Sequence, residues 1–185
     1  MSTPPSTTTI ATAPFDDKNA DVILRTSDNV DFYVYKVVLG LASPLFKDTF
    51  SLSQPPPQAN EPTTNGELLP VVPFTENSAT IDYLLRLCYP ITDPIQPTDL
   101  LAVARHLEAA AKYELLEATE LLRTSLRTFI SSQPLRVYAV ACRRTVALEE
   151  EANLAAHAWR ESCPKDWVEE MKSMRAGCYH RLIEF

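Results

Sequence analysis

The chain contains three histidines and four cysteines, residue types that could hold a metal ion. A tetrahedral zinc site places such ligands close in sequence, in patterns such as C-x₂₋₄-C or H-x₃₋₅-H. His157 and Cys163 are six positions apart, and Cys178 and His180 are two apart, so neither pair has this spacing. We interpret these side chains as packing residues and expect neither a metal site nor a bound cofactor.

The sequence also contains no motif that indicates nucleophilic catalysis or phosphate binding. No serine lies in a G-x-S-x-G turn, and glycines at positions 40, 66 and 177 alone cannot assemble a phosphate-binding loop. Ser43 precedes Pro44, where it suits the cap of a helix. Glu149, Glu150 and Glu151 suit the first turn of a helix, whose dipole they complement. We therefore expect no enzyme, and a small hydrolase is a disfavoured alternative.

Aromatic side chains gather at the end of the chain, where they suit either of two roles. The last 27 residues contain Trp159, Trp167, Tyr179 and Phe185. Aromatic residues are enriched at protein interfaces, and they equally close a helical core. The sequence leaves both roles open.

The charge balance argues against a nucleic-acid partner. The net charge is −7, and residues 1–132 hold 9 Lys and Arg against 16 Asp and Glu, which leaves no basic face for phosphate contacts. No apolar run approaches the roughly 20 residues that span a bilayer, and the polar start resembles no signal peptide. The four cysteines form no CxxC pair. Together these features predict a protein of the cytoplasm or nucleus.

Two strands and two short helices are predicted after the start of the chain. Residues 21–26 (DVILRT) and 30–35 (VDFYVY) have strand-forming side chains, and the SDN between them favours a hairpin turn. From Val38 onward, apolar residues recur at helical spacing, which puts Val38, Leu41, Ala42 and Leu45 on one stripe. Pro44 interrupts that stripe, so we predict two helices that meet at Ser43.

The remaining segments divide into irregular and helical parts. The Thr-, Ser- and Pro-rich residues 1–19 predict a flexible tail, and residues 51–67, with four of the fifteen prolines, predict a long surface loop. Residues 68–74 (LLPVVPF) predict a strand that its prolines confine to a sheet edge. Helices are predicted from Asn77 or Ser78 to Pro90, from Thr98 or Asp99, from Leu116, over 135–143 and 147–160, and over 165–176 with Gly177 ending the last.

These residues together resemble the signature of the BTB/POZ domain, an aspartate and strand followed by F-x-x-H-[K/R]-x-x-L-x-x-x-S-x-x-F. The chain matches it with Asp21, Phe32, Lys36, Leu39, Ser43 and Phe46. Residues 81–89 (IDYLLRLCY) resemble the helix that ends in the family's Tyr-Thr pair, and LEAAAKYELLEATELL resembles its paired C-terminal helices. The Pro-rich insertion and the later residues are most similar to the fungal branch, where a helical extension follows the domain.

The resemblance implies an α+β (mixed α/β) fold in which a small sheet packs on a helical cluster and extra helices follow. We assign residues 1–19 to the tail, 20–131 to the BTB/POZ domain with its insertion at 51–67, and 132–185 to a C-terminal helical extension. Two positions depart from the family pattern, since Tyr35 stands at the histidine position and Pro90 where a threonine is usual.

The resemblance also implies candidate partner-binding residues. Asp21 and Lys36 match positions that in some relatives form a charged pocket near the dimer surface; the alternative is a strand-end aspartate and a solvated lysine. Many dimeric members have an amphipathic helix and an exchanged strand before this point, where the present chain has MSTPPSTTTIATAPFDDKNA. A strand-swapped homodimer is therefore not expected, while a monomer and another kind of homodimer both remain open.

By this resemblance the chain is a protein–protein interaction module that binds other proteins and neither nucleic acid nor membrane. One hypothesis is an adaptor for a cullin-type ubiquitin ligase. The alternative is a transcription-associated scaffold that acts through partner proteins without binding DNA directly.

Overall fold

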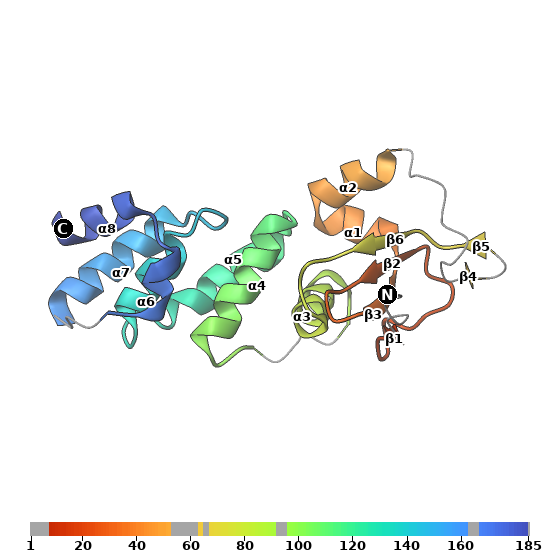
Figure 1. Ribbon diagram of the computed structural model, residues 1–185, viewed down its shortest axis with the longest axis horizontal. Helices are drawn as coiled ribbons and strands as arrows, with labels where there is room; N and C mark the ends of the chain where they lie inside the picture. The colour runs from red at the N-terminus through yellow and green to blue at the C-terminus, as the bar shows by residue number, and fades with distance from the viewer. Residues whose placement is uncertain (1–7, 53–62, 65–66, 92–95, 163–166, 185) are drawn as a thin grey trace, which may run out of the picture. The chain divides into compact units, whose positions relative to one another are not determined.

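The computed structural model describes residues 8–52, 63–64, 67–91, 96–162 and 167–184. The chain forms two compact units, Met1–Pro94 and Ile95–Phe185 (Figure 1). The described strands all belong to the first unit, and the described part of the second unit is helical. This small mixed sheet with accompanying helices confirms the predicted α+β class.

The sheet of the first unit has the strand order β1-β3-β2-β6. Strands β2 (Val22–Arg25) and β3 (Val30–Val34) form the predicted antiparallel hairpin, in which Ile23 lies opposite Tyr33. The turn between them places Asn29 at a positive φ of 59°. Asparagine tolerates this conformation better than most residues, which explains why the SDN sequence turns the chain here.

Strand β6 (Val71–Pro73) pairs in parallel with β2 and lies at the sheet edge, as its prolines predict. The loop predicted over residues 51–67 is less irregular at its end than expected. There β4 (Thr63–Thr64) pairs with β5 (Glu67–Leu68), while residues 53–62 and 65–66 lie outside the described chain.

The helices α1 (Lys36–Ala42) and α2 (Pro44–Ser51) meet at Ser43, as predicted. Ser43 has extended backbone angles, and its Oγ accepts a hydrogen bond of 3.1 Å from the Phe46 N–H. Pro44 occupies the first turn of α2, where its missing N–H costs nothing. The break therefore has a local cause in the Ser-Pro pair.

Replacing Ser43 with alanine is expected to lower the free energy of unfolding by about 1 kcal/mol, because the Phe46 N–H loses its acceptor. Urea denaturation followed by circular dichroism measures the change. Ser51→Ala serves as the control, since Ser51 lies exposed at the other end of α2. Equal stabilities of the two variants would contradict the capping role.

The tail predicted over residues 1–19 is wrong for residues 8–19, which pack against the sheet. Strand β1 (Thr9–Ile10) pairs in parallel with β3, placing Thr9 opposite Val30. Phe15 is fully buried, and its carbonyl accepts a 2.9 Å hydrogen bond from the Tyr33 N–H. The flexible tail was predicted from the overall Thr, Ser and Pro content of the segment. That content does not show that one buried aromatic ring and pairing with the open edge of β3 are enough to order these residues.

Helix α3 (Ser78–Cys88) completes the first unit and packs on α1. The Asn77 side chain accepts from the Thr80 N–H, and the helix ends before Pro90, both as predicted. The core of this unit comes from the hairpin, the helices and the N-terminal segment: Phe15, Val22, Ile23, Leu24, Phe32, Val34, Leu39, Ile81 and Leu84.

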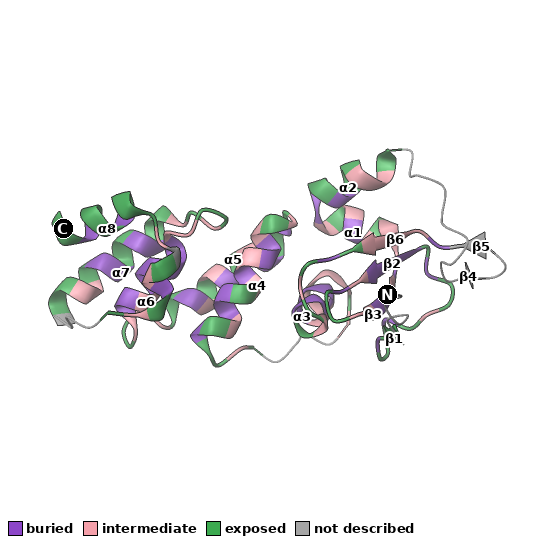
Figure 2. Cartoon of the chain, in the orientation of Figure 1, coloured by how far each residue is buried: buried purple, intermediate pink, exposed green. Residues whose placement is uncertain are grey.

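The second unit contains five α-helices in its described part, α4 (Leu100–Lys112), α5 (Leu116–Arg127), α6 (Pro134–Ala141), α7 (Glu149–Ser162) and α8 (Ala176–Glu184). A short 3₁₀ helix, η1 (Glu169–Ser173), precedes α8. The contacts of α4 with α5, and of α6 with α7 and η1, build its core. Figure 2 colours the buried residues of these helices purple. They include Val103, Leu107, Leu122, Leu126, Val137, Val140 and Ala155.

The last predicted helix is wrong in both position and ending. Instead of a helix over residues 165–176 that Gly177 terminates, the chain forms η1 and then α8, which includes Gly177. A glycine that ends a helix usually takes a positive φ, and Gly177 does not. The prediction failed because a glycine is also tolerated in the exposed first turn of a helix, which is where Gly177 lies in α8.

Candidate functional site

The predicted pair Asp21 and Lys36 does come together, but through the main chain. Asp21 Oδ1 accepts a 2.7 Å hydrogen bond from the backbone N–H of Lys36, the first residue of α1. Tyr35, which precedes α1, makes no side-chain capping bond, so Asp21, the residue directly before β2, caps the helix instead. In the described part of the chain their side chains form no ion pair with each other, and a partner-binding role for them stays a prediction.

Tyr35 occupies the histidine position of the family pattern and makes two hydrogen bonds there. Its N–H donates to Tyr89 Oη at 2.8 Å, and its own Oη donates to Asp17 Oδ2 at 2.5 Å. The hydrogen bond from Tyr35, with further bonds from Asn19, lowers the pKa of Asp17. The same bond raises the pKa of Tyr35. Tyr35 therefore ties the N-terminal segment to the junction of β3 and α1.

An aromatic group lies beside this junction and holds Phe15. The Phe15 ring meets Tyr89 edge to face, with centroids 5.4 Å apart, and Phe32 at 5.8 Å. The guanidinium of Arg86 lies 5.6 Å from the Phe15 centroid, within cation–π range. Burial raises the pKa of Tyr89 to about 12, so this hydroxyl stays protonated at neutral pH.

Helices α1 and α2, together with Leu52 directly after α2, expose a set of large apolar side chains, which we name the α1–α2 apolar face. Val37 and Leu41 lie one turn apart on α1 and are 65% and 85% exposed, and Leu45 and Leu52 extend the set. The buried positions of the two helices are Leu39 and Phe46, so the apolar face is additional to the core contact. Several apolar side chains exposed together in one region commonly mark an interaction surface.

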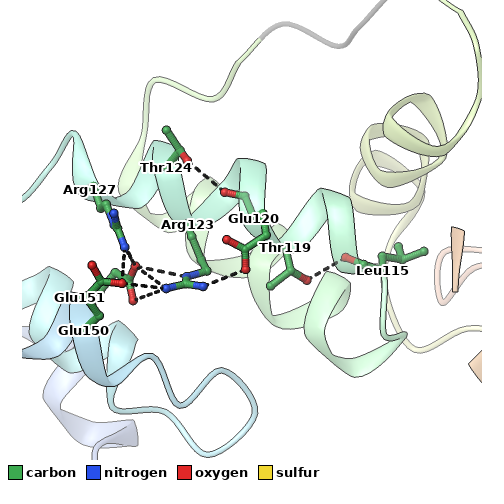
Figure 3. Close-up of polar contacts among 8 residues, drawn as sticks. All are labelled: Leu115, Thr119, Glu120, Arg123, Thr124, Arg127, Glu150 and Glu151. Carbon is green, nitrogen blue, oxygen red and sulfur yellow. Dashed lines mark hydrogen bonds and ion pairs between the residues drawn. The ribbon is translucent and has the colours of Figure 1, made fainter. Parts of the chain in front are cut away.

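The acidic run at the start of α7 has a role that the sequence did not reveal. All three glutamates lie in the first turn, as predicted, but the Glu151 side chain is completely buried. Its Oε1 accepts from Arg123 Nη2 at 3.0 Å and from Arg127 Nε at 2.9 Å, while Glu150 pairs with the same arginines at the surface (Figure 3). This α5–α7 ion cluster, made of Arg123, Arg127, Glu150 and Glu151, joins α5 to α7.

The pKa of Glu151 follows from these contacts. Burial by itself would raise the pKa, but the hydrogen bonds from Arg127 and Arg123 outweigh it, and the pKa is lowered from its ordinary 4.5. Glu151 is therefore a buried carboxylate that stays ionised. The sequence contains one weak signal for this cluster. Arg123 and Arg127 are four positions apart, so they lie on the same side of a helix, where both can reach the glutamate run of another helix.

Three further features considered from the sequence are a metal site, a membrane-spanning segment and the late aromatic residues. The described residues contain no group of three or more His, Cys, Asp and Glu side chains that could hold a metal ion, and Cys163 lies outside them. Among the described helices, none combines the length and apolar character needed to cross a bilayer. Of the late aromatic residues, Trp159 is half-buried, Trp167 and Tyr179 are 59% and 49% exposed, and Phe185 lies outside the described chain.

Comparison with models of known protein families identifies the family of this chain. Residues 13–130 match the model of the BTB/POZ domain, which is more than half of the chain, so the chain belongs to the BTB/POZ family. Domains of this family mediate protein–protein interactions and often dimerise. No curated protein matches the chain. The match begins before Phe15 and ends before α6, whereas the predicted limits at 20 and 131 and the fungal branch stay predictions.

Proposed function

We propose that this chain is an adaptor that associates through the α1–α2 apolar face with a second copy of itself and brings other proteins together. The observation that carries the proposal is the exposure of Val37, Leu41 and Leu52 in a chain of a protein-interaction family. Covering such side chains removes apolar area from water, which favours association by about 25 cal/mol per Å².

The proposed dimer keeps its N-terminal strand within each chain. Strand β1 pairs with β3 of the same chain, and Phe15 fills the core beside it. Exchange of this strand between copies would require both contacts to break first. This supports a dimer without strand exchange, in which the helices make the contact.

Replacing Leu41 with glutamate is expected to weaken the self-association at least about tenfold, because a charge is placed where an apolar contact forms. Sedimentation velocity across a range of concentrations measures the dissociation constant. Leu116→Glu is the matched control, since Leu116 is an exposed leucine of α5 at 62%. A wild-type chain that stays monomeric at all concentrations, or equal weakening by both variants, would contradict the proposal.

The partner class that we propose is the cullin scaffold of a ubiquitin ligase. The support is the family assignment, since adaptors of this kind dock a cullin through the helical face of the domain while another region recruits the substrate. Here the residues after the family match fold into α6, α7 and α8, which would then carry the recruiting surface.

Titration of the full chain with a cullin N-terminal domain by calorimetry tests the adaptor role. Binding at micromolar concentrations supports it, and no binding at tens of micromolar rejects it. In that case affinity purification that recovers nuclear partners without a cullin would favour the scaffold that acts in transcription through other proteins. The acidic balance of residues 1–132 agrees with recruitment to chromatin through a partner.

A further inference from the structure

Two cysteines far apart in sequence lie side by side in the second unit. Cys142 ends α6 and is half-buried, and Cys178 lies in α8 and is buried. Both residues line the same small cavity, which places their side chains in one region of the second unit. Tyr138 Oη donates to the carbonyl oxygen of Cys178 at 2.7 Å, which fixes the backbone of α8 against α6.

A small cavity is lined in part by both cysteines. Its volume is about 70 Å³, and its lining includes Cys142, Cys178, Leu148, Arg175 and Arg181. Arg181 Nη2 lies 3.8 Å from Cys178 Sγ, so a guanidinium donor stands at the sulfur. About 10–15 Å³ of this kind of volume is enough to hold one water molecule, so a molecule as small as hydrogen peroxide fits the cavity.

We propose that Cys142 and Cys178 are a site of reversible oxidation by hydrogen peroxide, at which a disulfide joins α6 to α8. The proposal is independent of the adaptor role. It assigns a covalent modification to the C-terminal helices and names a small hydroperoxide as the oxidant.

The reaction proceeds in two balanced steps. The Cys178 thiolate attacks one peroxide oxygen, so an S–O bond forms, the O–O bond breaks and hydroxide leaves; Cys178 becomes a sulfenic acid, oxidised by two electrons. Cys142 sulfur then attacks Cys178 sulfur, the S–S bond forms and the S–O bond breaks. The departing oxygen leaves as water with the proton of Cys142. In total, two thiols and one peroxide give one disulfide and two waters.

The order of the steps follows from the surroundings of the two thiols. Burial, together with the neighbouring Cys178, raises the pKa of Cys142 above its ordinary value of 9.0, so Cys142 is a neutral thiol at physiological pH. The thiolate is the species that attacks peroxide. The Arg181 guanidinium lies 3.8 Å from Cys178 Sγ, so we assign the first attack to Cys178 and the resolving step to Cys142.

The test uses the full chain with Cys88→Ser and Cys163→Ser, which leaves the two cysteines of the pair. Hydrogen peroxide is expected to produce a mass loss of two hydrogens, a Cys142–Cys178 peptide in a non-reducing digest, and full reversal by dithiothreitol. In the further variant Cys142→Ser, a sulfenic-acid probe such as dimedone should label Cys178. In Cys178→Ser, the probe should label Cys142 at least about tenfold less, because that thiol stays protonated.

Several outcomes would overturn the proposal. These are disulfides only between molecules, stepwise gain of oxygen without a disulfide, no reaction while the chain stays folded, or equal labelling of the two serine variants. The same treatment of the chain with all four native cysteines distinguishes a Cys142–Cys178 bond from a bond to Cys163, and the latter would also reject the proposal. Circular dichroism before and after oxidation checks that each variant is folded.

Discussion

Replacing Phe15 with alanine is expected to lower the free energy of unfolding of the first unit by about 3–5 kcal/mol. The ring is fully buried and touches Tyr89 and Phe32, so its removal leaves a cavity that the rigid hairpin cannot fill. Loss of the ring also removes the cation–π contact with Arg86. Few single substitutions in this unit should cost more.

Hydrogen–deuterium exchange read by mass spectrometry locates the effect. In Phe15→Ala, the amide of Tyr33, which donates to the Phe15 carbonyl, should exchange faster together with the rest of β3. Ile10→Ala is the matched control, because Ile10 lies in β1 and is 59% exposed, and its effect should stay within about 0.5 kcal/mol. If Phe15→Ala left the exchange of β3 unchanged and lowered the free energy of unfolding by less than about 1 kcal/mol, the result would support the flexible tail predicted from composition.

Replacing Glu151 with alanine is expected to destabilise the second unit by about 3 kcal/mol, since breaking a buried ion pair leaves the partner charges uncompensated. The Arg123 and Arg127 side chains are 23% and 40% exposed, so water relieves part of the loss. The effect therefore falls at the lower end of the range for a buried pair. Both tryptophans belong to this unit, so urea denaturation followed by tryptophan fluorescence measures it.

The neighbouring residue provides the control for this experiment. Glu150 pairs with the same two arginines, but its side chain is 62% exposed, so Glu150→Ala should cost no more than about 1 kcal/mol. Equal losses in the two variants would show that charge at the start of α7, rather than burial of Glu151, stabilises the unit.

Acid should abolish the Glu151 contribution in a defined direction. The folded-state pKa of Glu151 lies below its ordinary 4.5, so the contribution is complete above that pH and is lost as the pH falls through the folded-state value. Glu151→Gln removes the titrating group. The stability of the wild-type chain should therefore fall more steeply below pH 4.5 than that of the variant, and parallel pH profiles would contradict this assignment.

The candidate site was partly predictable. The resemblance identified Asp21 and Lys36 as neighbours, and the structure places the Asp21 carboxylate on the Lys36 N–H. The exposure of Leu41 was not predictable, because helical spacing put Leu41 on the same stripe as Val38 and Ala42, and only the packed structure shows that Leu39 and Phe46 face the core instead. The partner-binding role of Asp21 and Lys36 is untested, and the α1–α2 apolar face came from the structure.

The sequence by itself determined where most elements begin and end. Ser43 with Pro44, Asn77, and Asp99 each act on residues up to three positions away, so a local pattern contains the whole interaction. Tertiary structure alone decided that Phe15 is in the core, that Glu151 is a buried anion, and that Cys142 and Cys178 line one cavity. Each of these depends on side chains many residues away, and burial is a property of the packed chain that no local spacing specifies.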